Sequence, residues 1–314
     1  MNMKKILTLV TFVLILSTLV IIFLKEKNTN DLIKKTSDVK SLSSPVLTIA
    51  AAGDIACDVF TSGRKQCQQR ETADLVEKIN PDHVLVLGDL QYGNHLLNNQ
   101  SPYHATWGKF KNITLPTVGN HEYDNGKIAT YYQYFGKLAG EVNKGWYSLT
   151  KQNWRLISLN SNCYLAGGCH KGSPQYNWLE KELENNQIKC TLAFWHHPLF
   201  SSGQHGKNAN MQDFWELLYQ HNVDLILNGH DHSYERFSKQ DPFGKLDEKN
   251  GITQFVVGTG GRNLYSIPMV LSNSVVRQSE NFGILKLTLK KAEFSWELIT
   301  TKGELLDQGS DYCN

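Results

Sequence analysis

A chain of 314 residues can form one large domain or two ordinary ones, and 40% hydrophobic with 20% charged residues is typical of a globular protein with a sizeable core. The formal charge of +2 hides an asymmetry, because residues 1–45 hold seven lysines against three acidic residues, so residues 46–314 carry 25 basic and 27 acidic side chains. A nearly neutral body lacks the clustered positive charge that nucleic-acid binding requires, so we predict a protein with no nucleic-acid partner.

The N-terminal segment is predicted to be a membrane signal. Ile6–Leu24 is a nineteen-residue run without a charge that directly follows Lys4 and Lys5. As a helix it would span about 28 Å, close to the hydrocarbon core of a bilayer. We interpret residues 1–27 as a signal-anchor, with a cleaved signal peptide as the alternative, since no A-x-A-like cleavage site follows. The polar residues 28–45 predict a flexible linker.

The side of the membrane on which the body lies is indicated by opposing signals. Four lysines in residues 25–35 favour a cytoplasmic body under the positive-inside rule. Six cysteines favour the outside: two pairs are close in sequence, Cys57 with Cys67 and Cys163 with Cys169, which leaves Cys190 and Cys313. An even number of cysteines after an export signal indicates disulfides, whose connectivity stays open. We expect an extracytoplasmic body, membrane-anchored or secreted, because large domains translocate regardless of flanking charge.

From Val46 onward, short apolar runs alternate with amphipathic segments, which predicts one α/β catalytic domain over residues 46–314. The expected buried strands are Val46–Ala52, His83–Leu87, Leu115–Val118, Thr191–Trp195 and Asp224–Leu227. The expected helices are Glu71–Ile79, Pro174–Asn185 and Met211–Gln220, and Ser173-Pro174 is a helix start. The C-terminal third is predicted to be mostly strands: Phe255–Gly258, Ile284–Leu289 and Phe294–Ile299.

Side chains that can bind metals follow five of these strands directly. They are Asp54, Asp89, Asn120 with His121, His196, and His230 with His232. In α/β sheets the carboxyl ends of the strands are where ligands bind. A glycine precedes the side chain in four of the five cases, which would permit a sharp turn of the backbone.

The residue types indicate which metals such a site would bind. Carboxylates, imidazoles and an amide oxygen together suit first-row transition metals better than calcium. His230 and His232 are two residues apart in an expected extended segment, so they would project the same way and could serve adjacent ions. A carboxylate such as Asp89 can bridge two metals, and two ions about 3.5–4 Å apart can activate a shared water.

These motifs resemble those of the calcineurin-like metallophosphoesterases, and their order resembles the purple acid phosphatase branch. The resemblance rests on GDIA at Asp54, GDLQY at Asp89 and Tyr92, GNHE at Asn120 and His121, AFWH at His196 and GHDH at His230 and His232. It covers Leu47 to Arg236 in motif order. It implies a four-layer α/β/β/α sandwich as the fold, with two metal ions.

The resemblance also implies roles for the residues. Asp54, Tyr92 and His232 would bind one metal, Asn120, His196 and His230 the other, and Asp89 would bridge the two. A phenolate suits ferric iron, so Fe(III) is expected at Tyr92 and a divalent Fe, Zn or Mn beside it. The implied catalytic residues are His121, contacting the phosphate, and His205, protonating the leaving alcohol or stabilising the developing charge.

Simpler interpretations exist for several residues. Asp54 or Asp89 alone could cap a helix, Asn120 could stabilise a turn, and Tyr92 could be a loop aromatic. We expect His197 to pack or to support the ligands, and the remaining histidines to be ordinary. Gly258–Gly261 does not form a phosphate-binding motif and is interpreted as a tight turn, with a substrate-lining role as the alternative. The aromatic cluster around Trp107 and Tyr131–Phe135 is interpreted as helix packing rather than a substrate cleft.

The implied function is hydrolysis of small phosphate monoesters by attack of a metal-bound hydroxide, as in an acid phosphatase. A phosphodiesterase acting on nucleotides or lipid headgroups is the alternative. A non-catalytic surface binding module is less compatible with the sequence, because every expected ligand position is filled. The physiological substrate, the second metal and the oligomeric state are left open by the sequence.

Overall fold

The computed structural model describes residues 20–29, 46–58, 67–185 and 187–314, which belong to two compact units, residues 1–45 and 46–314. In the first unit, residues 20–29 form a helix with exposed side chains. No helix in the described ranges is both long and apolar enough to cross a membrane. Most of the apolar run Ile6–Leu24 and most of the expected linker lie outside the described residues.

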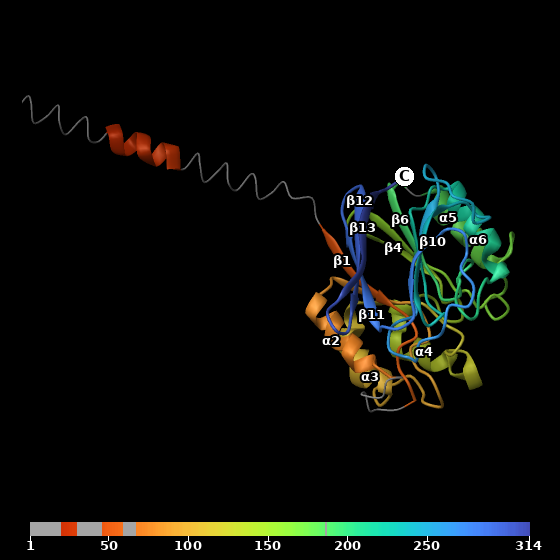
Figure 1. Ribbon diagram of the computed structural model, residues 1–314. Coiled ribbons are helices and arrows are strands. Elements are labelled where there is room, and N and C mark those ends of the chain that lie inside the picture. The colour runs from red at the N-terminus through yellow and green to blue at the C-terminus, as the bar shows by residue number, and fades with distance from the viewer. Residues whose placement is uncertain (1–19, 30–45, 59–66, 186) are drawn as a thin grey trace, which may run out of the picture. The chain divides into compact units, whose positions relative to one another are not determined.

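The second unit contains two β-sheets that face each other (Figure 1). The first has six strands in the order β13-β12-β11-β1-β2-β3. Their bounds are β1 Leu47–Ala52, β2 His83–Val86, β3 Thr114–Pro116, β11 Gly283–Leu289, β12 Glu293–Thr300 and β13 Leu305–Tyr312. Strands β1, β2 and β3 run parallel, whereas β11 pairs antiparallel with β1, β12 with β11, and β13 with β12.

The second sheet has seven strands in the order β10-β8-β9-β7-β6-β5-β4. Their bounds are β4 Tyr147–Lys151, β5 Trp154–Ser158, β6 Cys190–Phe194, β7 Leu225–Asn228, β8 Tyr234–Gln240, β9 Ile252–Val257 and β10 Ser274–Gln278. The central strands β5, β6, β7 and β9 run parallel. Each sheet therefore has a parallel centre, and the carboxyl ends of its central strands share one edge.

Helices cover the outer faces of both sheets. In Figure 1, α2 (Gln69–Ile79) and α3 (Pro102–Thr106) lie outside the six-stranded sheet, and α5 (Pro174–Glu184) and α6 (Gln212–Gln220) lie outside the other. The remaining helices are α4 (Ile128–Phe135) and the 3-10 turns η1 (Trp107–Ile113), η2 (Asp124–Gly126), η3 (Gly136–Ala139) and η4 (Ala209–Met211). This arrangement confirms the four-layer α/β/β/α fold.

Successive side chains of a central strand pack alternately into two different cores. In β6, Leu192 and Phe194 belong to the core between the two sheets, whereas Ala193 packs in a second core beneath α5 and α6. A strand covered on both faces is apolar throughout, which is why such runs are visible in the sequence. The side chains of the aromatic cluster around Trp107 and α4 are buried in the first core, as their interpretation as packing residues requires.

Candidate metal centre

The polar side chains singled out in the sequence lie together at the carboxyl ends of the central strands of both sheets. Asp54 follows β1, Asp89 follows β2, and Asn120 with His121 follows β3. From the opposite sheet, His196 follows β6, and the pair His230 and His232 follows β7. The site is therefore built between the sheets, half from each.

The backbone turns sharply at several of these positions, and the ligand-type residues themselves adopt the unusual conformation. Asp54, Asp89 and His230 have φ angles of 60°, 51° and 73°. This left-handed conformation is costly for side chains other than glycine and is concentrated at functional sites.

The glycines before these residues act mainly by leaving space, which corrects the expectation from sequence that they would supply the turns. Of the four, only Gly88 has a positive φ, of 86°. At Gly119, an added Cβ would lie 2.1 Å from Oδ1 of Asp89. No side chain fits there, because the two strand ends approach too closely.

Tyr92 is at the centre of one group of side chains. Its hydroxyl lies 2.9 Å from Oδ1 of Asp54, 3.1 Å from Oδ2 of Asp89 and 2.8 Å from Nε2 of His232. All four side chains are buried, with Asp54 fully inaccessible. Two carboxylates, a phenol and an imidazole thus converge on one point.

His196 is at the centre of a second group. Its Nε2 lies 3.2 Å from Oδ1 of Asn120, 3.2 Å from Nδ1 of His230 and 3.2 Å from Oδ2 of Asp89. Because Oδ2 of Asp89 also approaches Tyr92, this carboxylate lies between the two groups. One Asp54 oxygen, one Asp89 oxygen and one His196 nitrogen lie within 4.8 Å of one another.

The hydrogen bonds of two histidines fix which ring nitrogen faces the cluster. Nδ1 of His196 lies 2.8 Å from the carbonyl oxygen of Leu87, and Nδ1 of His232 lies 2.6 Å from that of Asn263. A carbonyl only accepts, so each Nδ1 donates a proton to it and Nε2 is the nitrogen turned toward the carboxylates. Histidines that bind metals are oriented in this way. The donor set therefore fits transition-metal ions.

The electrostatics of the cluster reflect crowding of buried charges. Burial alone would lower the pKa of His196, but the carboxylate of Asp89 raises it to about 9. Burial likewise opposes ionisation of Asp89, yet His196 holds its pKa below the usual range. Burial and the charge of His196 lower the pKa of His230 to about 2, so this imidazole is neutral and able to bind a cation.

Glu122 supports the cluster and was not singled out in the sequence analysis. Its buried carboxylate accepts hydrogen bonds from the backbone N–H groups of Asp89, Leu90 and Gly119, at 2.9, 2.9 and 2.8 Å. It therefore joins the end of β2 to the end of β3. Burial, followed by the charge of Asp89, raises the pKa of Glu122 to about 7. Glu122 is the last residue of the GNHE motif, and this position could have indicated its role from the sequence.

The two remaining histidines lie on the accessible side of the cluster. His121 places Nε2 3.8 Å from Oδ2 of Asp89, and its Nδ1 lies 2.6 Å from Oδ2 of Asp124. The ring of His205 is exposed and stacks on that of His230, with centroids 4.3 Å apart. All nine residues expected at the site are thus in one contact network.

Asp231, between the two histidines of the GHDH motif, supports the loop that carries His205. Its buried carboxylate accepts a hydrogen bond from the His205 backbone N–H at 2.8 Å and another from the Ser201 hydroxyl. An added Cβ at Gly203 would lie 2.4 Å from the Asp231 carboxyl carbon, so the loop packs closely on this side chain. Asp231 is therefore a positioning residue.

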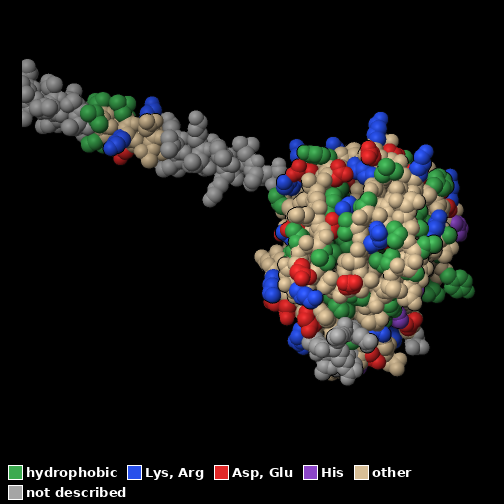
Figure 2. Space-filling view, viewed as in Figure 1, with side chains coloured by type: hydrophobic (Ala, Val, Ile, Leu, Met, Phe, Trp, Pro, Cys, Tyr) green, Lys and Arg blue, Asp and Glu red, His purple; other side chains and the backbone are tan. Residues whose placement is uncertain are grey.

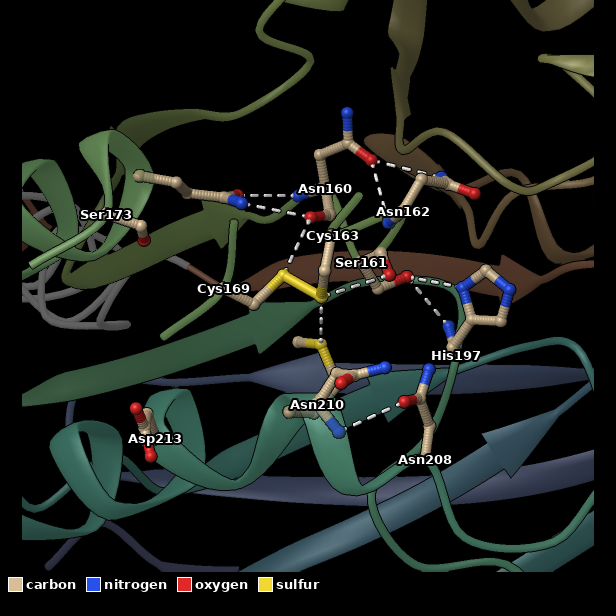
Figure 3. Close-up of a disulfide and its surroundings, with 12 residues drawn as sticks. Asn160, Ser161, Asn162, Cys163, Cys169, Ser173, His197, Asn208, Asn210 and Asp213 are labelled. Atoms are coloured by element: carbon tan, nitrogen blue, oxygen red, sulfur yellow. Dashed lines mark hydrogen bonds between the residues drawn. A yellow bond between two sulfur atoms is a disulfide. The ribbon is translucent and has the colours of Figure 1, made fainter. Parts of the chain in front are cut away.

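His197 forms a hydrogen bond with Ser161, which is in the segment that contains a disulfide. Figure 3 shows Ser161 next to the Cys163–Cys169 bridge and directed toward His197, whose Nδ1 lies 2.8 Å from Oγ of Ser161. Burial, followed by the charge of His196, lowers the pKa of His197 to about 3. Its ring lies 4.3 Å from that of His230, so it packs against a ligand-type side chain.

The cysteines form three disulfides: Cys57–Cys67, Cys163–Cys169 and Cys190–Cys313. A second group with metal-type atoms, made of Cys190, Asp224 and Cys313, contains the third of these bridges. Its sulfur atoms are bonded to each other, so we do not regard it as a metal site. The disulfides fit an extracytoplasmic protein.

Comparison with known proteins places this site in a family. Residues 47–234 match the model of the calcineurin-like phosphoesterases. The chain is 29% identical to purple acid phosphatase 15 of Arabidopsis thaliana over 72% of this chain and 47% of that protein. It is 30% identical to the Fe(3+)-Zn(2+) purple acid phosphatase 12 of the same plant, over 49% of this chain and 36% of that protein.

The fold is also similar to that of a solved purple acid phosphatase from yellow lupin (Lupinus luteus) seeds. The TM-score is 0.71 at 21% identity, over 86% of this chain and 54% of the lupin chain. The chain spans about half or less of the length of the curated relatives described here.

Proposed function

The chain belongs to the calcineurin-like phosphoesterase family, and from this premise we propose that it is a metal-dependent enzyme that hydrolyses small phosphate monoesters. One observation carries the proposal: Asp89 lies between a group centred on Tyr92 and a group centred on His196. Two adjacent groups of oxygen and nitrogen donors that share a carboxylate are suited to two adjacent cations.

The donors divide into two proposed metal sites. Asp54, Tyr92 and His232 would bind one ion, Asn120, His196 and His230 would bind the other, and Asp89 would bridge them. We place Fe(III) at Tyr92, because a phenolate is a hard anionic donor, and a divalent Fe, Zn or Mn in the second site. When bound, the two cations would polarise the phosphoryl oxygens and lower the pKa of a bound water.

The side chains around the metals would bind and orient the substrate. His121 is partly exposed and its Nδ1 donates to Asp124, so the imidazolium form of this ring would donate from Nε2 to a phosphoryl oxygen. His205 is exposed beside His230, where it would donate a proton to the departing alcohol oxygen. Asp231 would hold His205 there through the backbone N–H.

A phosphodiesterase is the alternative within the same chemistry, and it is separated from a monoesterase only by substrate preference. The non-catalytic binding module is disfavoured, because all seven donors are present and converge. On the face shown in Figure 2, basic and acidic side chains are interspersed, which supports a small substrate rather than a nucleic-acid backbone.

We propose an extracytoplasmic location, which the disulfides support, with attachment through the apolar segment Ile6–Leu24.

The proposal is tested by elemental analysis, a visible spectrum and two assays on one purified sample. We expect roughly two metals per chain. Hydrolysis of p-nitrophenyl phosphate should exceed that of bis-p-nitrophenyl phosphate. Asp89→Asn should lose both metals and activity, while Asp74→Asn, an exposed aspartate on α2, should lose neither. Tyr92→Phe should remove any tyrosinate-to-iron absorption band.

The outcomes separate the candidate functions. Folded protein that binds no metal after supply of iron, zinc and manganese, and that hydrolyses neither ester, would refute the enzyme and leave a binding module. Preference for the diester would assign the phosphodiesterase instead.

A further inference from the structure

In the loop between β9 and β10, the segment of residues 265–271 is attached at both ends to segments of the proposed metal centre. At its start, the Tyr265 backbone N–H donates to the carbonyl of His232 at 2.8 Å. The Tyr265 ring stacks on the His232 ring, 3.9 Å away and nearly parallel at 8°, and lies 5.5 Å from the ring of His205. At its end, the Leu271 N–H donates to Oγ of Ser202 at 2.9 Å.

Both attachments lie on the side of the site that carries His205. Ser202 is three residues before His205 in the same loop, and the Tyr265 ring is close to the rings of both His205 and His232. The proposed donor to the leaving group is therefore next to the β9–β10 loop. His121, in contrast, approaches Asp89 and Asp124.

Between its two attachments, the loop exposes consecutive apolar residues. Residues 266–271 read Ser-Ile-Pro-Met-Val-Leu, and Met269 and Val270 are 70% and 49% exposed. Pro268 is three residues from each attachment point, so its Cα lies at most about 11 Å from those of Tyr265 and Leu271. Single exposed apolar residues are ordinary, but a run of them at the rim of a polar site marks a surface that contacts a ligand.

We propose that residues 266–271 form an apolar wall on the leaving-group side of the site, and that the enzyme prefers phosphate esters whose alcohol carries an alkyl or acyl chain. The inference rests on the proposed phosphoesterase function and adds the class of leaving group. The polar cluster would bind the phosphoryl group, and Met269 and Val270 would remove part of the chain from water. The chain could belong to a soluble amphiphile or to a lipid in a membrane.

The test compares two substrates that differ only in their chain. Ethyl phosphate and octyl phosphate, the latter below its micelle concentration, release alcohols of nearly the same acidity, so a difference in kcat/KM reports contacts with the chain. The variants are Met269→Gln and Val270→Ser in the full-length, metal-loaded protein. Val46→Ser is the matched control, because Val46 is 45% exposed but precedes β1, at the opposite end of that strand from Asp54.

The wild type should favour octyl phosphate, and Met269→Gln should lower the octyl-to-ethyl ratio of kcat/KM about fivefold by removing apolar contact area. Val270→Ser should act in the same direction, and in both variants ethyl phosphate hydrolysis should fall less than octyl phosphate hydrolysis. Val46→Ser should leave the ratio unchanged. Faster hydrolysis of phosphatidic acid in vesicles than of octyl phosphate would assign the chain to a membrane lipid, and the reverse order to a soluble amphiphile.

Other results would overturn the inference. A wild-type ratio near one, or an equal loss for both substrates in Met269→Gln, would exclude the apolar wall while leaving the phosphoesterase proposal intact. The same holds if p-nitrophenyl phosphate is hydrolysed and neither alkyl ester is. If the metal-loaded protein hydrolyses no ester, the proposed function fails and the inference fails with it.

Discussion

Asp231 provides the sharpest test of how this site is organised, because it contacts no expected substrate atom and yet supports His205. Replacing it with alanine removes the acceptor for the His205 backbone N–H at 2.8 Å and for the Ser201 hydroxyl. A hydrogen bond to a charged acceptor contributes about 1.5–3 kcal/mol. If the whole free energy of the bond to the His205 N–H serves to hold the imidazole in place for catalysis, losing the bond raises the activation barrier by the same amount. At 1.36 kcal/mol per factor of ten, kcat/KM then falls about 10- to 100-fold.

The dependence of the hydrolysis rate on the leaving group distinguishes this positioning role from a general loss of structure. p-Nitrophenolate departs without a proton, whereas an alkoxide requires one, so Asp231→Ala should slow ethyl phosphate hydrolysis more than p-nitrophenyl phosphate hydrolysis. Asp231→Asn retains an oxygen that can accept from His205 and should restore most of the rate. Ser201→Ala removes only the hydroxyl bond and should have a smaller effect.

Steady-state kinetics on both substrates, with metal content and Tm measured on the same samples, provide the check. Equal losses on the two substrates, or a loss of metal that matches the loss of rate, would contradict the proposed link between Asp231 and His205.

Three further predictions follow from other parts of the structure. Removing metal with a chelator should lower Tm and added metal should restore it, because Asp54 and Asp89 are buried side by side. A ligand at 100 times its Kd adds about 2.7 kcal/mol to the free energy of unfolding. An unchanged Tm in differential scanning fluorimetry would contradict the metal site. Burial raises the pKa of Asp224 to about 6, above its unfolded value of 3.8, so its contribution to stability is complete below pH 3.8 and is lost as pH rises through 6. Urea titrations should therefore show Asp224→Asn gaining on the wild type between about pH 4 and pH 6, by up to about 3 kcal/mol, and a constant difference over this range would refute this. Replacing Cys190 and Cys313 with serine should lower the free energy of unfolding by about 2–5 kcal/mol, because their disulfide closes a loop with a sequence separation of 123, and the activity of the folded fraction should be unchanged.

The sequence determined the central strands and the identity of the residues at their ends. Strands such as β6 are covered on both faces, so they are apolar throughout and visible as runs. Helix α5 begins where Ser173 and Pro174 predicted, with the Ser173 hydroxyl accepting from the N–H of Tyr176. These features depend on neighbouring residues alone. Less apolar strands such as β4, β8, β10 and β13 were not expected, because their partly exposed faces give no continuous apolar run.

Only the tertiary structure decided how these strand ends form one site. Asp54 and Asp89 come from one sheet and His196 and His230 from the other, and no local pattern specifies that two sheets face each other. The same holds for the carbonyl of Leu87, which fixes the tautomer of His196 over a separation of 109 residues. Such contacts depend on packing between distant segments, whereas the residue types of the expected ligands can be identified from the sequence itself.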